Sequence, residues 1–318
     1  MPGTLLGSCP YCQEAQVAQG CYGTILSLTC PANKVVKVVS AHYGWFPGIC
    51  GGSSCGGAYH AGNCGMYNVY DNIARFCNGQ GSCNFPVATN ALFAGPQISN
   101  YFCPLCSTRV QVHYTCILPT ALQCSQLSGR TPLLVRYTAS SFWRREPGRG
   151  DITCPDDLAT LTPIDAAAIP AYIPEFARFA APHNLLWCPA ECDTNSSYIQ
   201  VDLGKVVRVT GYAIQGRLGY EQWVSSISVD YSTDGRTWLS LPNSPDVQPQ
   251  PTLGMAGTTN AIFGANKNSD KLTICDLSSF GIQARYIRAW VRTYNNYPCL
   301  NFDVFTCTES VQSEYLTF

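Results

Sequence analysis

Apolar and polar residues alternate along several short segments of this chain, which is the pattern of β-strands with one buried face. The alternating segments are residues 24–29, 34–39, 109–114, 198–203, 206–214, 227–231 and 284–291. Clusters of glycine and proline separate many of these segments. Many short strands without long helices predict a sandwich or a barrel, so the expected fold class is mostly β.

Two local features add detail to this pattern. Within residues 67–76, Val69, Ile73 and Phe76 recur at helical spacing, so we expect a short helix with these three side chains on one face. His113 follows an apolar neighbour in an alternating segment and is therefore expected on the solvent face of its strand.

The chain is expected to form two domains, because 318 residues are many for one compact domain. We assign residues 1–20 to an N-terminal extension, 21–116 to a first module, 117–123 to a linker, 124–307 to a second module and 308–318 to a tail. The linker is short and contains a proline, which limits how far the two modules can separate.

The cysteine content indicates an oxidising compartment. Nineteen cysteines would not stay paired in a reducing cytosol, so we expect a secreted, extracellular, disulfide-bonded protein. The odd count leaves at least one thiol free or bonded to another chain, so an oligomer formed through that cysteine stays open. The first residues lack the basic and apolar regions of a signal peptide, so we expect a removed signal or a larger precursor.

The charge balance excludes some partners. Charged residues make up 12% of the chain and the net charge is -1, so no basic surface is expected for nucleic acid. The spacings Cys9-x-x-Cys12 and Cys103-x-x-Cys106 suit zinc, but the other cysteines are scattered and only four histidines are present. We therefore predict disulfides and no metal site. Calcium at a barrel end stays open, without a clustered carboxylate loop to support it.

The sequence contains no recognisable catalytic motif. Its four histidines stand in no nucleophile or metal motif, and there is no Gly-x-Ser-x-Gly, His-Glu-x-x-His or phosphate-binding glycine loop. We expect a binding protein and not an enzyme.

The first module carries a series of spaced motifs. They are Cys21–Cys30 (CYGTILSLTC), Ala41–Trp45 (AHYGW), Cys77–Cys83 (CNGQGSC) and Val110–Cys116 (VQVHYTC), with Val87, Asn90 and Phe93 in step. In these motifs the module resembles the rhamnose- and galactose-binding lectin domain first known from sea urchin eggs. The resemblance implies a small disulfide-rich α/β lectin fold. It also implies the disulfides Cys21–Cys50, Cys30–Cys116 and Cys77–Cys83, and a bond from Cys55 or Cys64 to Cys103 or Cys106, for which we take Cys64–Cys106.

The same resemblance implies candidate ligand-binding residues. Tyr43 and Asn90 match the family's ligand-facing positions, and His42 precedes Tyr43 in its motif. The family's glutamate is Tyr22 here, and its Phe-Gly-Asp-Pro-Cys motif is replaced by residues 93–97, without the aspartate. Loss of two carboxylates removes strong hydrogen-bond acceptors, so a protein ligand for this module stays open.

The second module carries a different set of motifs. They include Thr138–Ser141 (TASS), Trp187, Tyr198–Gly204 (YIQVDLG), Gln215–Arg217 (QGR), Tyr231–Gly235 (YSTDG) and Ala284–Arg288 (ARYIR). In these motifs the module resembles the discoidin domain, also called the coagulation factor V/VIII type C domain. The resemblance implies a distorted jelly-roll β-barrel with a Cys124–Cys307 disulfide and a core position for Trp187.

Several further expectations concern this module. Arg217 is expected to bond to Asp202 or to the backbone, and Asp234-Gly235 is expected to form a turn. One hypothesis pairs Cys275 with Cys299. Another bond is expected among Cys154, Cys188 and Cys192.

Ligands of this fold bind at one end, on loops that vary between members. Trp143, Arg144 and Arg145 lie in the first such loop, and an aromatic ring beside basic groups suits an acidic glycan or an anionic lipid headgroup. Arg149, Gly150 and Asp151 form the tripeptide that integrins recognise. Asn195, followed by two serines, is an acceptor for N-glycosylation.

The leading hypothesis is an extracellular recognition protein that binds glycans or glycoproteins at the cell surface or matrix. It would use the barrel loops and the lectin module. Two alternatives stay open. One is a cell- or matrix-adhesion molecule with an integrin or receptor partner, and the other is a protein that binds an anionic membrane surface through the barrel loops.

Overall fold

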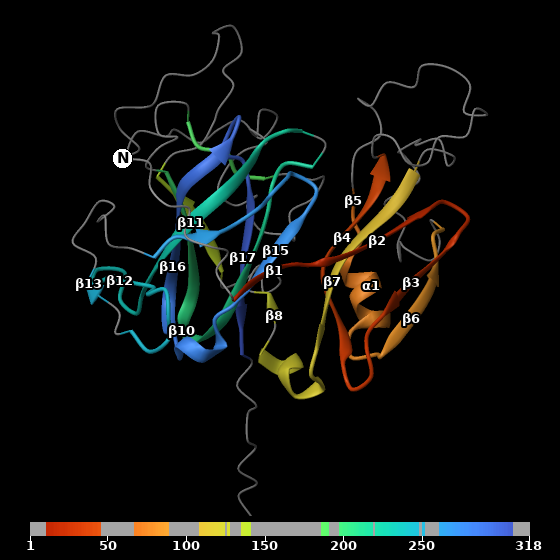
Figure 1. Ribbon diagram of the computed structural model, residues 1–318, viewed down its shortest axis with the longest axis horizontal. Helices are drawn as coiled ribbons and strands as arrows, with labels where there is room; N and C mark the ends of the chain where they lie inside the picture. The colour runs from red at the N-terminus through yellow and green to blue at the C-terminus, as the bar shows by residue number, and fades with distance from the viewer. Residues whose placement is uncertain are drawn as a thin grey trace, which may run out of the picture.

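The computed structural model describes residues 11–45, 67–88, 108–124, 126–127, 135–140, 186–190, 197–218, 220–247, 250–251 and 261–307. These residues form two β-rich bodies that lie side by side (Figure 1). The N-terminal module, in red to yellow, contains the helix α1, and the C-terminal module, in green to blue, contains the longer strands.

The N-terminal module is built on a four-stranded antiparallel sheet. Its strands, in the order β2-β7-β4-β5, are β2 (Gln16–Cys21), β7 (Thr108–Ile117), β4 (Val35–Trp45) and β5 (Tyr67–Asn68). A second, two-stranded sheet pairs β3 (Ile25–Thr29) with β6 (Ser82–Pro86). Side chains from both sheets and from α1 (Tyr70–Cys77) form one apolar core.

The helix α1 forms where helical spacing predicts it, but with a different buried face. It buries Tyr70, Ile73, Ala74 and Cys77, which recur at the spacing of one helix stripe. Phe76 is 63% exposed, so its expected place on the buried face is wrong. The stripe that begins at Tyr70 places residue 77, not residue 76, over the sheet.

The four-stranded sheet is buried on both of its faces. Val110 and Val112 of β7 point into the module's core, as alternation predicts. Gln111 and His113 point to the opposite face and are nevertheless 2% and 0% exposed. His113 is therefore not a solvent-face residue, because the C-terminal module covers that face of the sheet.

The C-terminal module contains the longer strands. They are β8 (Gln126–Leu127), β9 (Arg136–Ala139), β10 (Tyr198–Gln215), β11 (Trp223–Ser232), β12 (Leu239–Ser240), β13 (Gln250–Pro251), β14 (Phe263–Gly264), β15 (Leu272–Asp276), β16 (Gln283–Asn295) and β17 (Asn301–Thr306). Together with β1 (Cys12–Glu14), the described strands join into an 11-stranded curled sheet around one apolar core. Trp187 is fully buried in that core, as expected.

One bent strand, β10, joins the two halves of this curled sheet. Its first part pairs with β9 and β16, and its second part pairs with β15 and β17. The register shifts between Asp202 and Val207, and Gly204 in this stretch has a φ of 78°, which favours glycine. The alternation of apolar and polar residues predicted two strands, 198–203 and 206–214, but they form one strand with a bend.

The turn after β11 forms as its Asp-Gly pair predicts. Gly235 has a φ of 74°, and Oδ1 of Asp234 accepts hydrogen bonds from the backbone N–H groups of Arg236 and Thr237, both at 2.8 Å. These backbone bonds lower the pKa of Asp234 to about 2.

The N-terminal segment belongs to both modules. Strand β2 lies at the edge of the first module's sheet, whereas β1 adds to the second module by pairing with β15. Figure 1 shows this red segment crossing from one body to the other. A 3-10 helix (Pro119–Cys124) follows β7.

Apolar side chains from both modules meet at the junction. The shared cluster contains Ala15 and Val39 from the N-terminal side, and Ala213, Leu272, Ile274 and Phe305 from the C-terminal side. Val39 reaches this cluster because the register of β4 shifts between Val38 and Ser40. The two modules therefore share buried surface.

Four disulfides lie wholly within the described residues: Cys12–Cys275, Cys30–Cys116, Cys77–Cys83 and Cys188–Cys299. The second and third are the pairings that the lectin resemblance implies. The hypothesis that Cys275 pairs with Cys299 is wrong, because Cys275 bonds to Cys12 and Cys299 bonds to Cys188. For the same reason, Cys188 does not bond to Cys154 or Cys192.

The Cys12–Cys275 bond excludes zinc binding by the Cys9-x-x-Cys12 pair. Cys12 is bonded to Cys275, so it is not a zinc ligand in a pair with Cys9. Cys21 and Cys307 are disulfide-bonded as well, to partners that lie outside the described side chains. The Cys64–Cys106 pair lies outside the described residues.

Candidate functional site

Loops gather at one end of the C-terminal barrel. Because β10 bends at Gly204, its two ends, Tyr198 and Gln215, come to the same end of the barrel. Ser140, where β9 ends, is hydrogen-bonded to Tyr198, and Gln215 pairs with Leu272 at the start of β15. The described segments at this end include residues 186–190, 216–218, 220–222, 266–271 and 296–300. We call this the loop end.

The segment 216–222 places an aromatic ring and a cation together at the loop end. The guanidinium carbon of Arg217 lies 3.7 Å from the ring centroid of Tyr220, and the Tyr220 residue is 54% exposed. Nη1 of Arg217 donates to Oε1 of Gln222 at 2.8 Å, and the backbone N–H of Arg217 donates to the carbonyl of Gln222. The ring and the guanidinium are thus held by their own loop.

The side-chain partner of Asp202 is Arg285, not Arg217. Nε and Nη2 of Arg285 donate to the two carboxylate oxygens of Asp202 at 2.8 and 3.0 Å. Burial alone would raise the pKa of Asp202, but these bonds and the N–H of Gly204 lower it overall. Arg217 was expected to bond to Asp202 or to the backbone; Asp202 bonds to Arg285 instead, and Arg217 bonds to the carbonyl and the side chain of Gln222.

Amide side chains brace the same end from the segment after β16. Nδ2 of Asn295 and Nδ2 of Asn296 each donate to the backbone carbonyl of Glu221 at 2.8 Å. Tyr297 donates its hydroxyl to the carbonyl of Pro189 at 2.7 Å. No sequence motif predicted a role for these residues. Their signal is a run of Asn and Tyr that follows a predicted strand.

The disulfide Cys188–Cys299 ties two of these segments together. Both cysteines are buried, and Trp187 next to Cys188 pairs by its backbone with Leu300 next to Cys299. The rim of the loop end is therefore cross-linked both covalently and by hydrogen bonds. A rim held in this way loses little conformational entropy when a ligand binds.

Two lectin-type candidates in the N-terminal module, His42 and Tyr43, are buried. His42 and Tyr43 of β4 are 5% and 3% exposed, and Tyr43 belongs to the module's core. The two side chains point to opposite faces of the sheet, as neighbours in a strand do. A sugar that contacts both residues would have to reach both faces.

The remaining predicted site residues lie outside the described residues. They are Asn90, Trp143, Arg144, Arg145, Arg149, Gly150, Asp151 and Asn195. Ser140, which precedes the Trp143 loop, stands at the loop end through its bonds to Tyr198.

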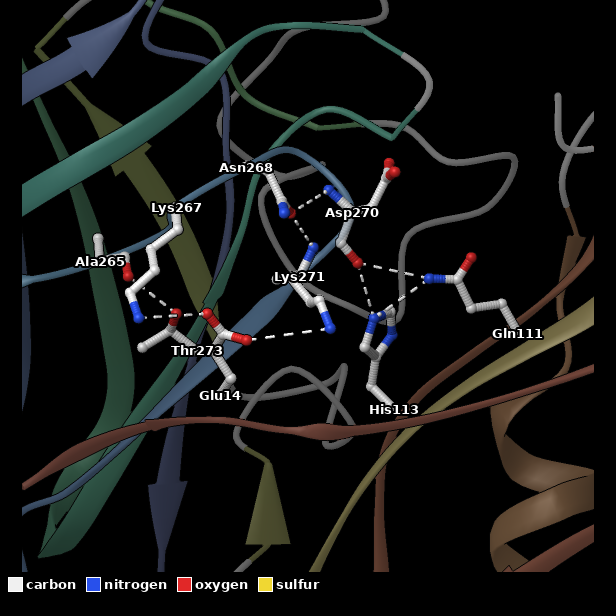
Figure 2. Close-up of polar contacts among 9 residues, drawn as sticks. All are labelled: Glu14, Gln111, His113, Ala265, Lys267, Asn268, Asp270, Lys271 and Thr273. Carbon is white, nitrogen blue, oxygen red and sulfur yellow. Dashed lines mark hydrogen bonds and ion pairs between the residues drawn. The ribbon is translucent and has the colours of Figure 1, made fainter. Parts of the chain in front are cut away.

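A second polar cluster lies where the two modules meet (Figure 2). Nε2 of His113 lies 3.0 Å from the backbone carbonyl of Asp270, and its Nδ1 lies 3.0 Å from Oγ of Ser40. Because a carbonyl only accepts, Nε2 carries the proton and Nδ1 accepts from Ser40. Burial lowers the pKa of His113 to about 4, so its ring is neutral at pH 7.

Ion pairs between β1 and the loop before β15 add to this junction. Glu14 lies 3.6 Å from Nζ of Lys267 and 3.9 Å from Nζ of Lys271 (Figure 2). Both lysines are well exposed, so these pairs contribute little stability. The strand pairing and the shared apolar cluster hold the junction more strongly.

Among the described residues, no group of three or more His, Cys, Asp or Glu side chains is arranged to hold a metal ion. Within the same part of the chain, no helix is long and apolar enough to cross a membrane.

Comparison with known families assigns both modules. Residues 28–116 match the D-galactoside/L-rhamnose binding SUEL lectin domain, and residues 169–303 match the F5/8 type C domain. Along the chain, a region that matches the SUEL lectin domain is thus followed by a region that matches the F5/8 type C domain. Neither family is described by a catalytic activity, and the order of the two domains is the one that the sequence motifs predict.

Curated relatives match part of this chain. Coagulation factor V of Mus musculus is 29% identical over 136 residues, which are 42% of this chain and 6% of that protein. Hemocytin of Bombyx mori is 24% identical over 196 residues, 58% of this chain and 6% of that protein. Lactadherin of Bos taurus is 27% identical over 141 residues, which are 43% of this chain and 30% of that protein. The matches therefore span only a minor part of each relative.

Among solved structures, the recombinant discoidin II of Dictyostelium discoideum is similar to this chain at 19% sequence identity. The TM-score is 0.39, and the match covers 60% of this chain and 62% of that chain.

Proposed function

We propose that this protein is an extracellular recognition protein that binds carbohydrate at the loop end of its F5/8 type C domain. The observation that carries the proposal is the exposed Tyr220 ring, braced by Arg217 within a rim of fixed amides. Sugars present an apolar C–H face beside hydroxyl groups. An exposed aromatic ring beside guanidinium and amide groups complements both features.

The loop that follows Ser140 starts at this same end and is expected to extend the site. Trp143, Arg144 and Arg145 in that loop would add a second aromatic ring and two cations. Such a composition favours glycans that carry acidic groups. This part of the proposal rests on the sequence of the loop and on the position of Ser140.

The SUEL lectin domain is proposed to take a secondary part. Its family is described as binding D-galactoside and L-rhamnose. In this chain the described candidates His42 and Tyr43 are buried, and the family's carboxylates are replaced. We therefore assign the principal glycan site to the F5/8 type C domain. The disulfides support an oxidising, extracellular location.

A glycan array probed with the intact chain tests this proposal. We expect binding to be weakened about tenfold by Arg217→Ala, which is the loss of about 1.4 kcal/mol from a charged contact. Trp143→Ala should weaken binding as well. Arg236→Ala is the matched control, because Arg236 is an exposed arginine beyond the turn at the opposite end of β11.

Three outcomes would contradict the proposal. One is the absence of binding to any glycan by the correctly folded chain. Another is sedimentation with acidic lipid vesicles without glycan binding, which would assign the loops to a membrane surface. The third is cell adhesion that Asp151→Glu abolishes while no glycan binds, which would assign the protein to integrin-type adhesion.

A further inference from the structure

A polar pocket of about 380 Å³ lies at the junction of the two domains. Its described lining consists of Val17, Gln19 and Gln111 from the SUEL lectin domain and Asn268, Asp270 and Lys271 from the F5/8 type C domain. The volume falls within the range of about 300–1,000 Å³ that is usual for small-molecule sites. The pocket opens to solvent, since Gln19, Asn268 and Asp270 are exposed.

Gln111 supplies an acceptor whose orientation is fixed. Its side chain is almost fully buried, and Nε2 donates to the backbone carbonyl of Asp270 at 3.4 Å beside the His113 ring. The amide therefore turns its Oε1 away from these contacts, as Figure 2 shows. No described residue donates a hydrogen bond to that oxygen. Because Gln111 lines the pocket, a ligand hydroxyl can donate to this oxygen.

Two other amides are oriented with their NH₂ groups available. Oε1 of Gln19 accepts from Nη1 of Arg109 at 3.2 Å. Oδ1 of Asn268 accepts from the backbone N–H groups of Asp270 and Lys271 at 3.1 and 2.8 Å (Figure 2). Because each oxygen is already engaged, the NH₂ groups of Gln19 and Asn268 are left as donors towards a ligand.

The two charged lining residues are of opposite sign. Oδ1 of Asp270 accepts from Oγ of Ser269 at 3.3 Å, which leaves the second carboxylate oxygen as an acceptor. Lys271 lines the pocket, and its ammonium lies 3.9 Å from Glu14. A site with one positive and one negative group favours a neutral ligand over a charged one.

We propose that this junction pocket binds a neutral mono- or disaccharide through adjacent hydroxyl groups. A hydroxyl donates and accepts at once, so neighbouring hydroxyls match a lining that alternates acceptors (Gln111, Asp270) with donors (Gln19, Asn268, Lys271). The site differs from the Arg217–Tyr220 site, because half of its described lining belongs to β2 and β7 and it needs both domains to form.

The pocket exists only because the domains are joined. Half of its described lining comes from β2 and β7, and the other half comes from the loop before β15. The bond from His113 to the Asp270 carbonyl fixes the two halves at one separation. A ligand at this site therefore contacts both domains and stabilises their union.

Nuclear magnetic resonance of the intact, nitrogen-15-labelled chain tests the pocket. The probes are methyl β-D-galactoside, methyl α-L-rhamnoside and lactose. We expect at least one probe to shift the side-chain amide signals of Gln111, Gln19 and Asn268. If none of the probes moves these signals, the proposal is overturned.

Matched variants locate the binding. Lys271→Met should weaken the affinity of that probe about tenfold, whereas Lys267→Met should leave it unchanged, since both lysines approach Glu14 but only Lys271 lines the pocket. Gln111→Met keeps the side-chain size and should abolish binding. Equal affinities for the Lys271 and Lys267 variants would overturn the proposal.

The two glycan proposals can fail separately. If array binding is lost in Arg217→Ala but is unchanged in Lys271→Met, and the pocket amides do not shift, the loop-end site stands and the pocket proposal falls. If the pocket amide signals shift and Arg217→Ala binds glycan like the wild type, the pocket proposal stands and the loop-end proposal falls.

Discussion

Cys12 and Cys275 lie 263 residues apart in the sequence and are joined by a disulfide that fastens β1 to β15. The bond connects the N-terminal segment to the sheet of the F5/8 type C domain, while the next strand, β2, belongs to the SUEL lectin domain. The chain therefore links the two domains twice, once through this segment and once after β7.

Removing this bond should release β1. In a Cys12→Ala, Cys275→Ala double variant, non-covalent contacts alone hold the strand: its pairing with β15, two flanking backbone hydrogen bonds, the burial of Ala15 and exposed ion pairs. We expect residues 11–15 to become cleavable by a non-specific protease under native conditions, and the unfolding free energy to fall by about 2–4 kcal/mol. Mass spectrometry of the digest measures the first effect, and denaturant unfolding measures the second.

The control for this variant is Cys77→Ala, Cys83→Ala. That bond closes a loop of only 6 residues inside the N-terminal module. Its loss should leave β1 protected. Equal cleavage near residue 12 in both variants would contradict the assigned role of the Cys12–Cys275 bond.

Acid should weaken the protein through His113. Burial lowers the pKa of His113 from 6.5 to about 4. Between these pH values the unfolded chain binds a proton at this histidine and the folded chain does not, so unfolding becomes easier as pH falls from about 6.5 to about 4. The loss amounts to about 3 kcal/mol at its full extent.

The variant His113→Gln isolates this effect. Glutamine does not titrate, so the decrease in unfolding free energy between pH 7 and pH 4 should be smaller in the variant by up to about 3 kcal/mol. Denaturant unfolding at a series of pH values measures the difference. If the unfolding free energies of the wild type and the variant fell in parallel with pH, His113 would be accessible to protons in the folded protein, and this prediction would be contradicted.

Gly211 should tolerate no side chain. A Cβ at this position would overlap the backbone carbonyl oxygen of Cys275 on the neighbouring strand β15. We expect Gly211→Ala to lower the unfolding free energy by about 1–3 kcal/mol or to prevent folding, as overpacking does. Gly264→Ala is the control, because its Cβ would meet nothing within 4 Å. A melting temperature for Gly211→Ala equal to that of Gly264→Ala would contradict this packing.

Local patterns allowed much of the fold to be predicted. Alternation located β3, β4, β7, β11 and β16, because each strand has one face in an apolar core. Alternation could not show what covers the second face of a strand. His113 has the same pattern as a solvent-facing residue, but the other domain buries it, and that burial depends on contacts far apart in the sequence.

The candidate site was predicted less completely. Arg217 was noticed through its motif, but its partner is Gln222 on the same loop and not Asp202 on a distant strand. Cys12 and Cys188 have partners that sequence spacing does not reveal, since disulfide pairing depends on the folded distance. The pocket between Gln111 and Lys271 requires both domains in place, so no single segment could indicate it.

Calorimetry of the intact chain tests most directly whether the two recognition domains form one body. The shared apolar cluster, the β1–β15 pairing and the His113–Asp270 bond predict that the domains unfold together, in one cooperative transition. Two separate transitions, each with the enthalpy of a single domain, would contradict the account.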